Sequence, residues 1–199
     1  MNFSNLNKHT PIQTIYSELY NIAHHILDEK LQYFSQTQYA VDVYNLASSY
    51  DIKIYEKYIP APPDKPAEIF GYLNTYSGKA IYLNTNTGPL TKRYTIVYSL
   101  AYYLFQGNNN TDFIHYFINP ILPADFKEQF YHIFTSFLIM PPTSVIKLMS
   151  QYTLKQADSK ITYNSWLNYL GNTLGLSIYH TATSFENVRT LYTFCPKII

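Results

Sequence analysis

The feature that most constrains the fold is a pair of short strands followed by a long apolar helix in the middle of the chain. Glu68–Leu73 and Ala80–Leu83 are predicted strands, joined by a turn in which Gly78 is free to take a positive φ. The loop Thr85–Leu90 then leads into a helix predicted over Thr91–Gln106. This order predicts an α+β fold in which a small sheet packs on that helix.

The rest of the chain is predicted to be mainly helical. In chain order the expected elements are a helix from Thr10 through Leu27, a helix over Thr37–Ser48, a strand over Ile52–Tyr55, a helix over Pro123–Met140, and short helices over Thr143–Ser150, Leu154–Ala157 and Tyr163–Leu174. Pro60–Pro66 predicts a loop, because proline lacks an amide donor. Leu191–Phe194, in a tail with little pattern, is predicted as an additional strand. We expect one domain over residues 1–199, with a core over 10–142 and a short helical lobe and tail over 143–199.

The central helix has the spacing of a zinc site without its chemistry. An H-E-x-x-H motif places two zinc-binding histidines four residues apart on one helix face, with a glutamate as the general base. Here the three positions are Tyr98, Ser99 and Tyr102. The surrounding residues nevertheless resemble the active-site helix of the ImmA/IrrE-type neutral zinc metallopeptidases. The framing residues that carry this resemblance are Arg93, Tyr94, Thr95, Ile96, Leu100 and Leu104.

Two further segments carry the same resemblance. Ile81–Asn84 is similar to the strand that precedes the active helix in this family. Phe134–Pro141 (FTSFLIMP) resembles the family's second signature, although Tyr131, His132 and Thr135 replace its usual small and amide residues. The resemblance covers roughly residues 68 to 174. It implies a zincin-like metallopeptidase fold, with the small sheet on an active-site-type helix inside a mostly helical domain.

The chemistry that this fold would need is missing at all three motif positions. A phenol, with a reference pKa near ~10, is a poor zinc ligand at neutral pH. The hydroxyl of Ser99 cannot serve as a base at pH 7. We therefore expect no catalytic residue, no metal ion, no cofactor and no enzymatic activity. We expect the rings of Tyr98 and Tyr102 to fill the former metal cavity.

The resembling family takes its third zinc ligand, a glutamate, from the following long helix. This implies Glu128 as the equivalent residue, or a position one or two residues later, at Gln129 or Phe130. Two interpretations of Glu128 stay open. It is either a relic ligand that now bonds one of the two motif tyrosines, or a solvated charge on a helix surface.

A relocated metal site is the alternative for these residues. Glu128 and His132 lie four residues apart on one helix face, and His115 is expected in the preceding loop. These three side chains would supply ligands, but nothing nearby supplies a base. Cys195 does not add another site, because a reactive cysteine needs a partner that stabilises its thiolate.

Composition excludes several classes of protein. The 199 residues carry a net charge of +1, and their 14 basic residues form no run. A nucleic-acid surface needs clustered basic residues, so direct nucleic-acid binding is not expected. A single cysteine forms no internal disulfide. No apolar run approaches the ~20 residues of a membrane helix, and the N-terminus lacks the apolar core of a signal peptide. We expect a cytoplasmic protein that does not bind membranes.

The resemblance implies a function in regulation. Active members of the family cleave helix-turn-helix repressors and so relieve repression on mobile elements or in stress responses. An inactive member would bind a protein partner of that kind without cleaving it. Two alternatives remain: an enzyme with a relocated metal site around Glu128 and His132, and a structural or self-associating protein. The last follows from the 22 tyrosines, since tyrosine is enriched at protein contacts. The sequence leaves the oligomeric state open.

Overall fold

The protein is described by a computed structural model that covers residues 6–35, 38–61, 68–76, 78–106, 112–118, 125–155 and 162–196. The chain divides into two compact units. The sheet unit comprises Asp42–Tyr131, and the helical unit comprises Met1–Val41 together with His132–Ile199. The sequence did not predict that the N-terminal helix would group with the C-terminal helices.

The sheet unit has the α+β architecture that the sequence predicted. Its elements are α2 (Val43–Ser48), β1 (Lys53–Lys57), β2 (Ile69–Asn74), β3 (Ala80–Asn84), α3 (Pro89–Gln106), β4 (Ile114–Ile118) and the first part of α4 (Phe126–Ile139). The strands form one sheet in the order β1-β3-β2-β4. β1 is parallel to β3, whereas β2 is antiparallel to both β3 and β4. Gly78, at φ 109°, makes the predicted turn between β2 and β3.

Strand β4 corrects the prediction that His115 lies in a loop. Ile114, Tyr116 and Ile118 are exposed on one side of the strand, while Phe117 is buried on the other. This period of two is typical of a half-buried strand. The pattern is only five residues long, and the sequence prediction missed it for that reason.

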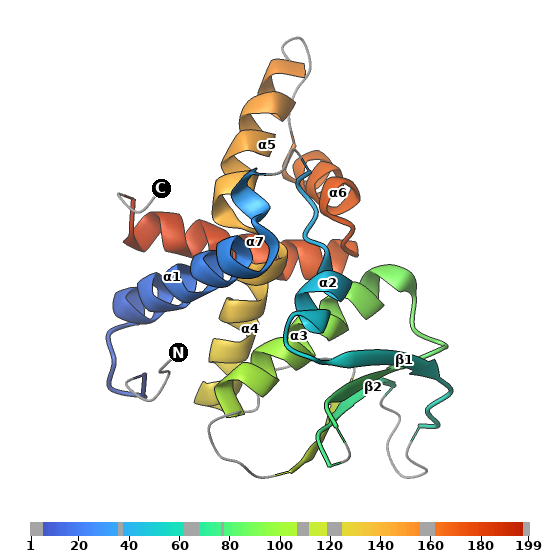
Figure 1. The fold of residues 1–199 in the computed structure, drawn as a ribbon. Helices are drawn as coiled ribbons and strands as arrows, with labels where there is room; N and C mark the ends of the chain where they lie inside the picture. Colours follow the sequence, from blue (N-terminus) through green and yellow to red (C-terminus); the bar gives the residue numbers. More distant parts are fainter. Residues whose placement is uncertain are drawn as a thin grey trace. The chain divides into compact units, whose positions relative to one another are not determined.

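Helix α3 packs on one face of the sheet (Figure 1). The residues that point to this face from the strands are among the most buried of the unit: Leu73, Ile81, Leu83 and Phe117. At Gly71, β2 lies close to both β3 and α3. A Cβ built there would lie 3.3 Å from Cγ2 of Thr95 and 2.5 Å from the carbonyl oxygen of Tyr82. The absence of a side chain at Gly71 is therefore a condition of this packing.

Helix α2 is shorter than predicted. It begins at Val43, whereas the sequence predicted a start at Thr37, which lies outside the described residues. Asp42 sets the start, because its carboxylate accepts a hydrogen bond from the amide of Asn45 at 3.0 Å. Apolar spacing extends upstream of Asp42, but a capping side chain overrides it.

The helical unit contains α1 (Ile12–Leu31), the 3₁₀ helix η2 (Tyr33–Ser35), the remainder of α4 from His132, α5 (Pro142–Lys155), α6 (Tyr163–Leu174) and α7 (Ile178–Phe194). Gly175 ends α6 in the left-handed conformation, at φ 68°, as its sequence position suggests. α5 is continuous from Pro142 to Lys155, where the sequence predicted two short helices.

Helix α7 corrects the strand prediction at Leu191–Phe194. Ser177 caps the helix by accepting a hydrogen bond from the amide of His180 at 3.3 Å. The buried face of α7 is partly polar, with Thr181 and Ser184 fully buried alongside Val188 and Leu191. An apolar period is weak when the buried face is polar, so the sequence showed little helical pattern.

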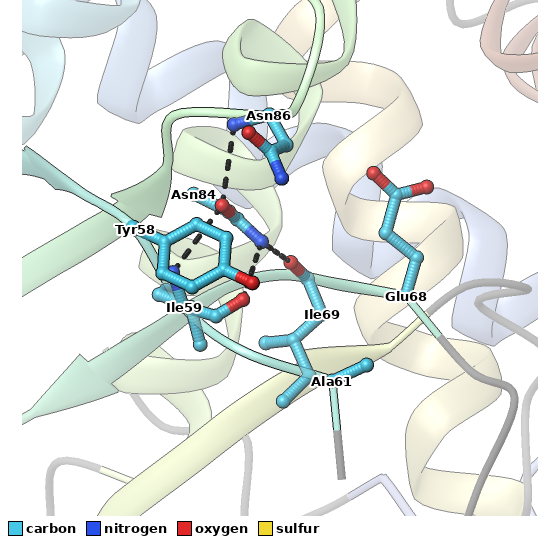
Figure 2. Close-up of a pocket in the computed structure, with 7 residues that line it drawn as sticks. All are labelled: Tyr58, Ile59, Ala61, Glu68, Ile69, Asn84 and Asn86. Carbon is cyan, nitrogen blue, oxygen red and sulfur yellow. Dashed lines mark hydrogen bonds between the residues drawn. The ribbon is translucent and has the colours of Figure 1, made fainter. Parts of the chain in front are cut away.

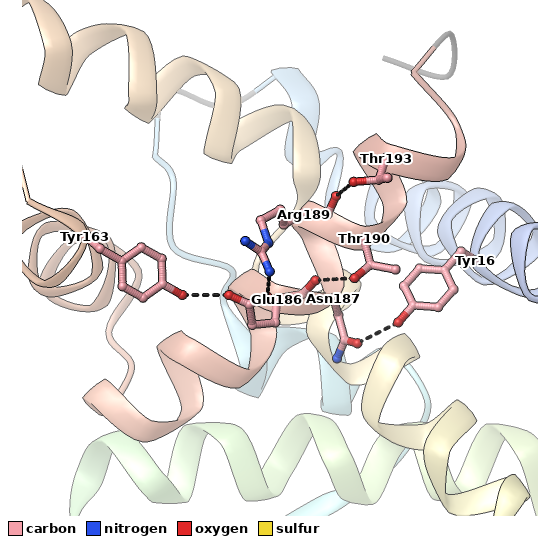
Figure 3. Close-up of polar contacts among 7 residues, drawn as sticks. All are labelled: Tyr16, Tyr163, Glu186, Asn187, Arg189, Thr190 and Thr193. Carbon is pink, nitrogen blue, oxygen red and sulfur yellow. Dashed lines mark hydrogen bonds and ion pairs between the residues drawn. The ribbon is translucent and has the colours of Figure 1, made fainter.

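Asn187 joins α7 to two other helices of the helical unit. Its amide oxygen accepts a hydrogen bond from the hydroxyl of Tyr16 on α1 at 3.0 Å (Figure 3). Its amide nitrogen donates to the hydroxyl of Ser136 on α4 at 2.9 Å. On the other side of α7, Glu186 accepts a hydrogen bond from Tyr163 and pairs with Arg189 (Figure 3). These contacts fix the orientation of a helix whose buried face is partly polar.

In the described part of the chain, no helix taken singly has the length and apolar character to cross a membrane. Helices α4 and α5 reach that length only as a pair, and the chain bends by 53° between them.

Candidate functional site

Helix α3 carries the three positions at which the sequence predicts a degenerate zinc site. Tyr98 is 3% exposed and Ser99 is fully buried, while Tyr102 is half-buried. The hydroxyl of Ser99 donates a hydrogen bond to the carbonyl of Thr95, one turn earlier, at 2.7 Å. A serine bonded to its own helix is oriented neither as a base nor as a nucleophile.

The ring of Tyr98 is packed between two other aromatic side chains. It stacks on Tyr94, with ring centroids 6.3 Å apart, and meets the ring of Phe117 edge to face at 5.4 Å. Burial raises the pKa of Tyr98 well above its ordinary value, and the nearby charge of Glu128 raises it further. The phenol therefore stays protonated at neutral pH, which disfavours it as a zinc ligand.

Tyr102 is covered by a side chain from β4. The imidazole of His115 stacks on its ring at a centroid distance of 3.8 Å. The ring of Tyr131, from α4, meets the ring of Tyr102 edge to face, with the centroids 5.2 Å apart. The hydroxyl of Tyr131 accepts a hydrogen bond from Gln106 at 3.1 Å. Burial, followed by the charges of Glu128 and Asp125, raises the pKa of Tyr102. The second motif position thus belongs to an aromatic cluster.

Glu128 lies close to both motif tyrosines. It is half-buried in the first turn of α4, where its amide donates a hydrogen bond to the carboxylate of Asp125 at 2.9 Å. Its charge raises the pKa of Tyr98 and of Tyr102, which places the carboxylate within electrostatic range of both phenols. The other candidates differ in environment, since Gln129 is exposed and Phe130 is buried. Of the three positions, only Glu128 combines a carboxylate with this proximity.

The residues of the alternative metal site belong to two different environments. His115 lies against Tyr102 in the sheet unit, and burial lowers its pKa to about 4. His132 is buried in the helical unit, where burial lowers its pKa to about 4 as well. His132 is near His180, whose pKa it helps to depress. Within the described ranges, no group of three or more His, Cys, Asp or Glu side chains is placed to hold a metal ion.

A pocket of about 260 Å³ lies at the end of β3, beside Asn84 (Figure 2). The amide nitrogen of Asn84 donates to the carbonyls of Ile59 and Ile69, at 2.9 and 2.8 Å. Its oxygen accepts from the amides of Ile59 and Asn86, at 3.3 and 3.2 Å. The whole hydrogen-bonding capacity of the amide is used within the chain. Asn84 therefore acts as a clip, in the sense that its side chain bonds the end of β3 to the backbone at Ile59 and at Ile69.

The sequence predicted Tyr98, Ser99 and Tyr102 as motif positions, but it did not predict the contact between Tyr102 and His115. The signal lay in Ile114–Ile118, where alternation places His115 and Phe117 on the same face of a strand. Once β4 is recognised, both residues are expected to face the helix that precedes them.

No protein-family model matches the chain, and comparison with curated proteins gives no match. The likeness to the ImmA/IrrE-type metallopeptidases therefore rests on the motif residues themselves.

Proposed function

We propose that this protein is a zincin-like pseudo-metallopeptidase of the ImmA/IrrE type, which has lost zinc chemistry and acts by binding another protein. The observation that supports the proposal best is the proximity of Tyr98, Tyr102 and Glu128 in the sheet unit. Two residues four apart on one helix and a carboxylate from the next helix are also the sources of the three zinc ligands in the resembling family, and the charge of Glu128 acts on both phenols. Two of the three side chains are phenols.

The surroundings of these residues favour an inactive protein. Zinc-assisted hydrolysis needs neutral imidazoles, an open coordination position for water and a base close to it. Burial keeps Tyr98 protonated, and Ser99 donates to its own helix. The stacked imidazole of His115 covers Tyr102. Each of these contacts contributes to packing at a position where a zinc enzyme would need a metal ligand or a general base.

Metal content and hydrolysis test the inactive half of the proposal. Purified protein, dialysed against buffer with a slight excess of zinc and then desalted, should hold far less than one zinc per chain by elemental analysis. It should not hydrolyse casein or a helix-turn-helix repressor above the rate of a blank. One tightly bound zinc per chain, or zinc-dependent cleavage, would refute the proposal.

The partner class follows from the same resemblance. Active relatives act on helix-turn-helix repressors in the cytoplasm, so the proposal makes a repressor of that kind the bound protein. Glu128 and the half-buried ring of Tyr102 provide a carboxylate and an aromatic edge for that contact. Tyrosine commonly anchors protein interfaces, because its ring is large and its hydroxyl keeps a polar partner.

A charge reversal with a matched neighbour tests the binding half. Glu128→Arg should weaken binding to a helix-turn-helix repressor from the same organism by about tenfold or more, since it removes a carboxylate from the contact. Gln129→Arg introduces the same side chain at an exposed position on the next residue of α4 and should bind like the wild type. Biolayer interferometry with the purified repressor measures both. Equal affinity for all three proteins, or no binding by any, would count against this partner.

A further inference from the structure

Four tyrosines form a row across the face of the sheet that is turned away from α3. Each strand contributes one of them, and each pair occupies facing positions of neighbouring strands. In order across the sheet, this tyrosine row consists of Tyr55, Tyr82, Tyr72 and Tyr116. Successive ring centroids lie 5.4, 4.8 and 5.2 Å apart. Cross-strand aromatic pairs of this kind stabilise a sheet.

The inner and outer rings of the tyrosine row differ in their surroundings. The inner rings, Tyr82 and Tyr72, each have a neighbouring ring on both sides, and the ammonium of Lys57 lies 4.7 and 4.9 Å from their centroids. Tyr55 and Tyr116 close the row and are 45% and 48% exposed. Within the described residues, the ring of Tyr116 has one neighbouring ring, that of Tyr72, and about half of the side chain is exposed.

The two edge strands differ in charge. β1 carries Lys53, Glu56 and Lys57, and charged side chains, lysine above all, are a common means of protecting a sheet edge from pairing. β4 contains no aspartate, glutamate, lysine or arginine. Its histidine, His115, is half-buried, stacks on Tyr102 and is neutral at pH 7, because partial burial lowers its pKa to about 4. Among the described strands, β4 pairs with β2 alone. Among the described strands, β4 is therefore the sheet edge that has no charged side chain to protect it.

The exposed side of β4 is also self-complementary. Ile114 and Ile118 flank Tyr116 symmetrically, and they are 45% and 36% exposed. A two-fold axis beside Tyr116, perpendicular to the sheet and midway between two β4 strands, would place Ile114 opposite Ile118 of a second copy. It would also place the two Tyr116 side chains opposite each other. A closed two-fold dimer requires a patch that matches itself in this way.

We propose that β4 is the surface through which the protein associates with a second copy of itself. The two β4 strands pair antiparallel, the two sheets become one, and the tyrosine row continues from one copy to the other. The strand contributes main-chain hydrogen bonds together with Ile–Ile and Tyr–Tyr contacts. A five-residue edge buries little area, so the dimer is weak and depends on concentration. This inference rests on the sheet alone and does not depend on the proposed loss of zinc chemistry.

Two lysine substitutions at opposite ends of the tyrosine row test the proposal. Tyr116→Lys places like charges opposite each other across the two-fold axis and should weaken dimerisation by about tenfold or more. Tyr55→Lys makes the same change at a similarly exposed position on the charged edge and should dimerise like the wild type. Sedimentation velocity over about a hundredfold range of concentration should show wild-type mass rising from 23.2 kDa towards twice that value. A wild-type protein that stays monomeric, or equal loss in both variants, would overturn the proposal.

Disulfide trapping tests the position of the two-fold axis independently of dimer strength. In a Cys195→Ser background, Tyr116→Cys should form a disulfide-linked dimer when copper phenanthroline and air oxidise the two thiols. Residues directly opposite in antiparallel strands have Cα atoms about 4.5–5.5 Å apart, within reach of a disulfide. Tyr55→Cys in the same background should remain monomeric on a non-reducing gel. Trapping at Tyr55, or at neither position, would contradict pairing through β4.

Discussion

The imidazole of His115 on β4 lies 3.8 Å from the ring of Tyr102 on α3, with the two planes inclined by 21°. This stack connects the edge strand of the sheet to the helix that carries the degenerate motif. Tyr102 stands at the position of the second histidine in the proposed motif, and partial burial keeps the stacked imidazole neutral by lowering its pKa to about 4. An imidazole is therefore present beside the motif, but as a packing partner of a phenol.

Gly71 gives a test of the close packing of β2 against β3 and α3. We expect Gly71→Ala to lower the free energy of unfolding by about 1–3 kcal/mol, because the new methyl group would lie 2.5 Å from the carbonyl oxygen of Tyr82. Gly88→Ala is the matched control, since nothing lies within 4 Å of a Cβ there. It should change stability by about 0.5 kcal/mol or less. Urea unfolding of both variants measures the difference, and equal stabilities would contradict the close approach.

Asn84 gives a test of the clip between β3 and its neighbours. We expect Asn84→Ala to cost about 2–4 kcal/mol of stability, because it leaves the buried backbone groups of Ile59 and Ile69 without this partner. Asn86→Ala removes an amide from an exposed position nearby and should cost about 0.5 kcal/mol or less. Thermal unfolding followed by circular dichroism compares the two. A mild effect at Asn84 would show that the amide is replaceable by water.

Stability should fall as the pH is lowered, because two histidines, His132 and His180, are buried and a third, His115, is half-buried. Burial lowers the pKa of His115, His132 and His180 to about 4, below the ordinary value of about 6.5. As pH falls from about 6.5 to about 4, the unfolded chain takes up protons that the folded chain does not bind. Each of the two buried histidines, His132 and His180, should then lower the free energy of unfolding by up to about 1.4 kcal/mol for each pH unit.

Denaturant unfolding at a series of pH values between about 7 and about 5 measures this dependence. His132→Leu should make the slope of stability against pH shallower, since one of the titrating groups is gone. His9→Leu removes a histidine from an exposed position and should leave the slope unchanged. A profile that is flat for the wild type would show that these imidazoles are accessible to protons in the folded state.

The elements that sequence reasoning identified are those whose signals are local. The strands on either side of Gly78 and the helix α3 are set by turn chemistry and by a sustained pattern, and both were predicted close to their observed bounds. β4 was missed because five residues carry little periodicity. α7 was missed because Thr181 and Ser184 occupy its buried face, and polar side chains there conceal a helical pattern.

The residues of the candidate site also differ in whether their positions depend on local spacing or on contacts between distant segments. The spacing of Tyr98, Ser99 and Tyr102 is local to one helix, so the sequence alone identified it. The position of His115 depends on β4 pairing with β2, which is a contact between segments far apart in the chain. The burial of His132 near His180 likewise depends on the packing of α4 and α7. Long-range pairing of this kind leaves no mark in the spacing of a single segment.

Restoring histidines at the motif positions tests the zincin-like arrangement itself. Tyr98→His/Tyr102→His would place two imidazoles one turn apart on α3, with Glu128 in range of both positions. Imidazole is smaller than phenol, so the substitutions add no volume. Tyr98→His/Tyr103→His introduces the same two side chains at a spacing that does not bring them to one face of the helix. Circular dichroism confirms that each variant is folded before metal is added.

The decisive measurement is the zinc content of these proteins, determined by elemental analysis after equilibration with zinc and desalting. We predict much less than one zinc per chain for the wild type and for Tyr98→His/Tyr103→His. We predict about one zinc per chain for Tyr98→His/Tyr102→His, reduced when Glu128→Ala is added. One zinc per chain in the wild type, or none in a folded Tyr98→His/Tyr102→His protein, would contradict a zincin-like site that has lost its ligands.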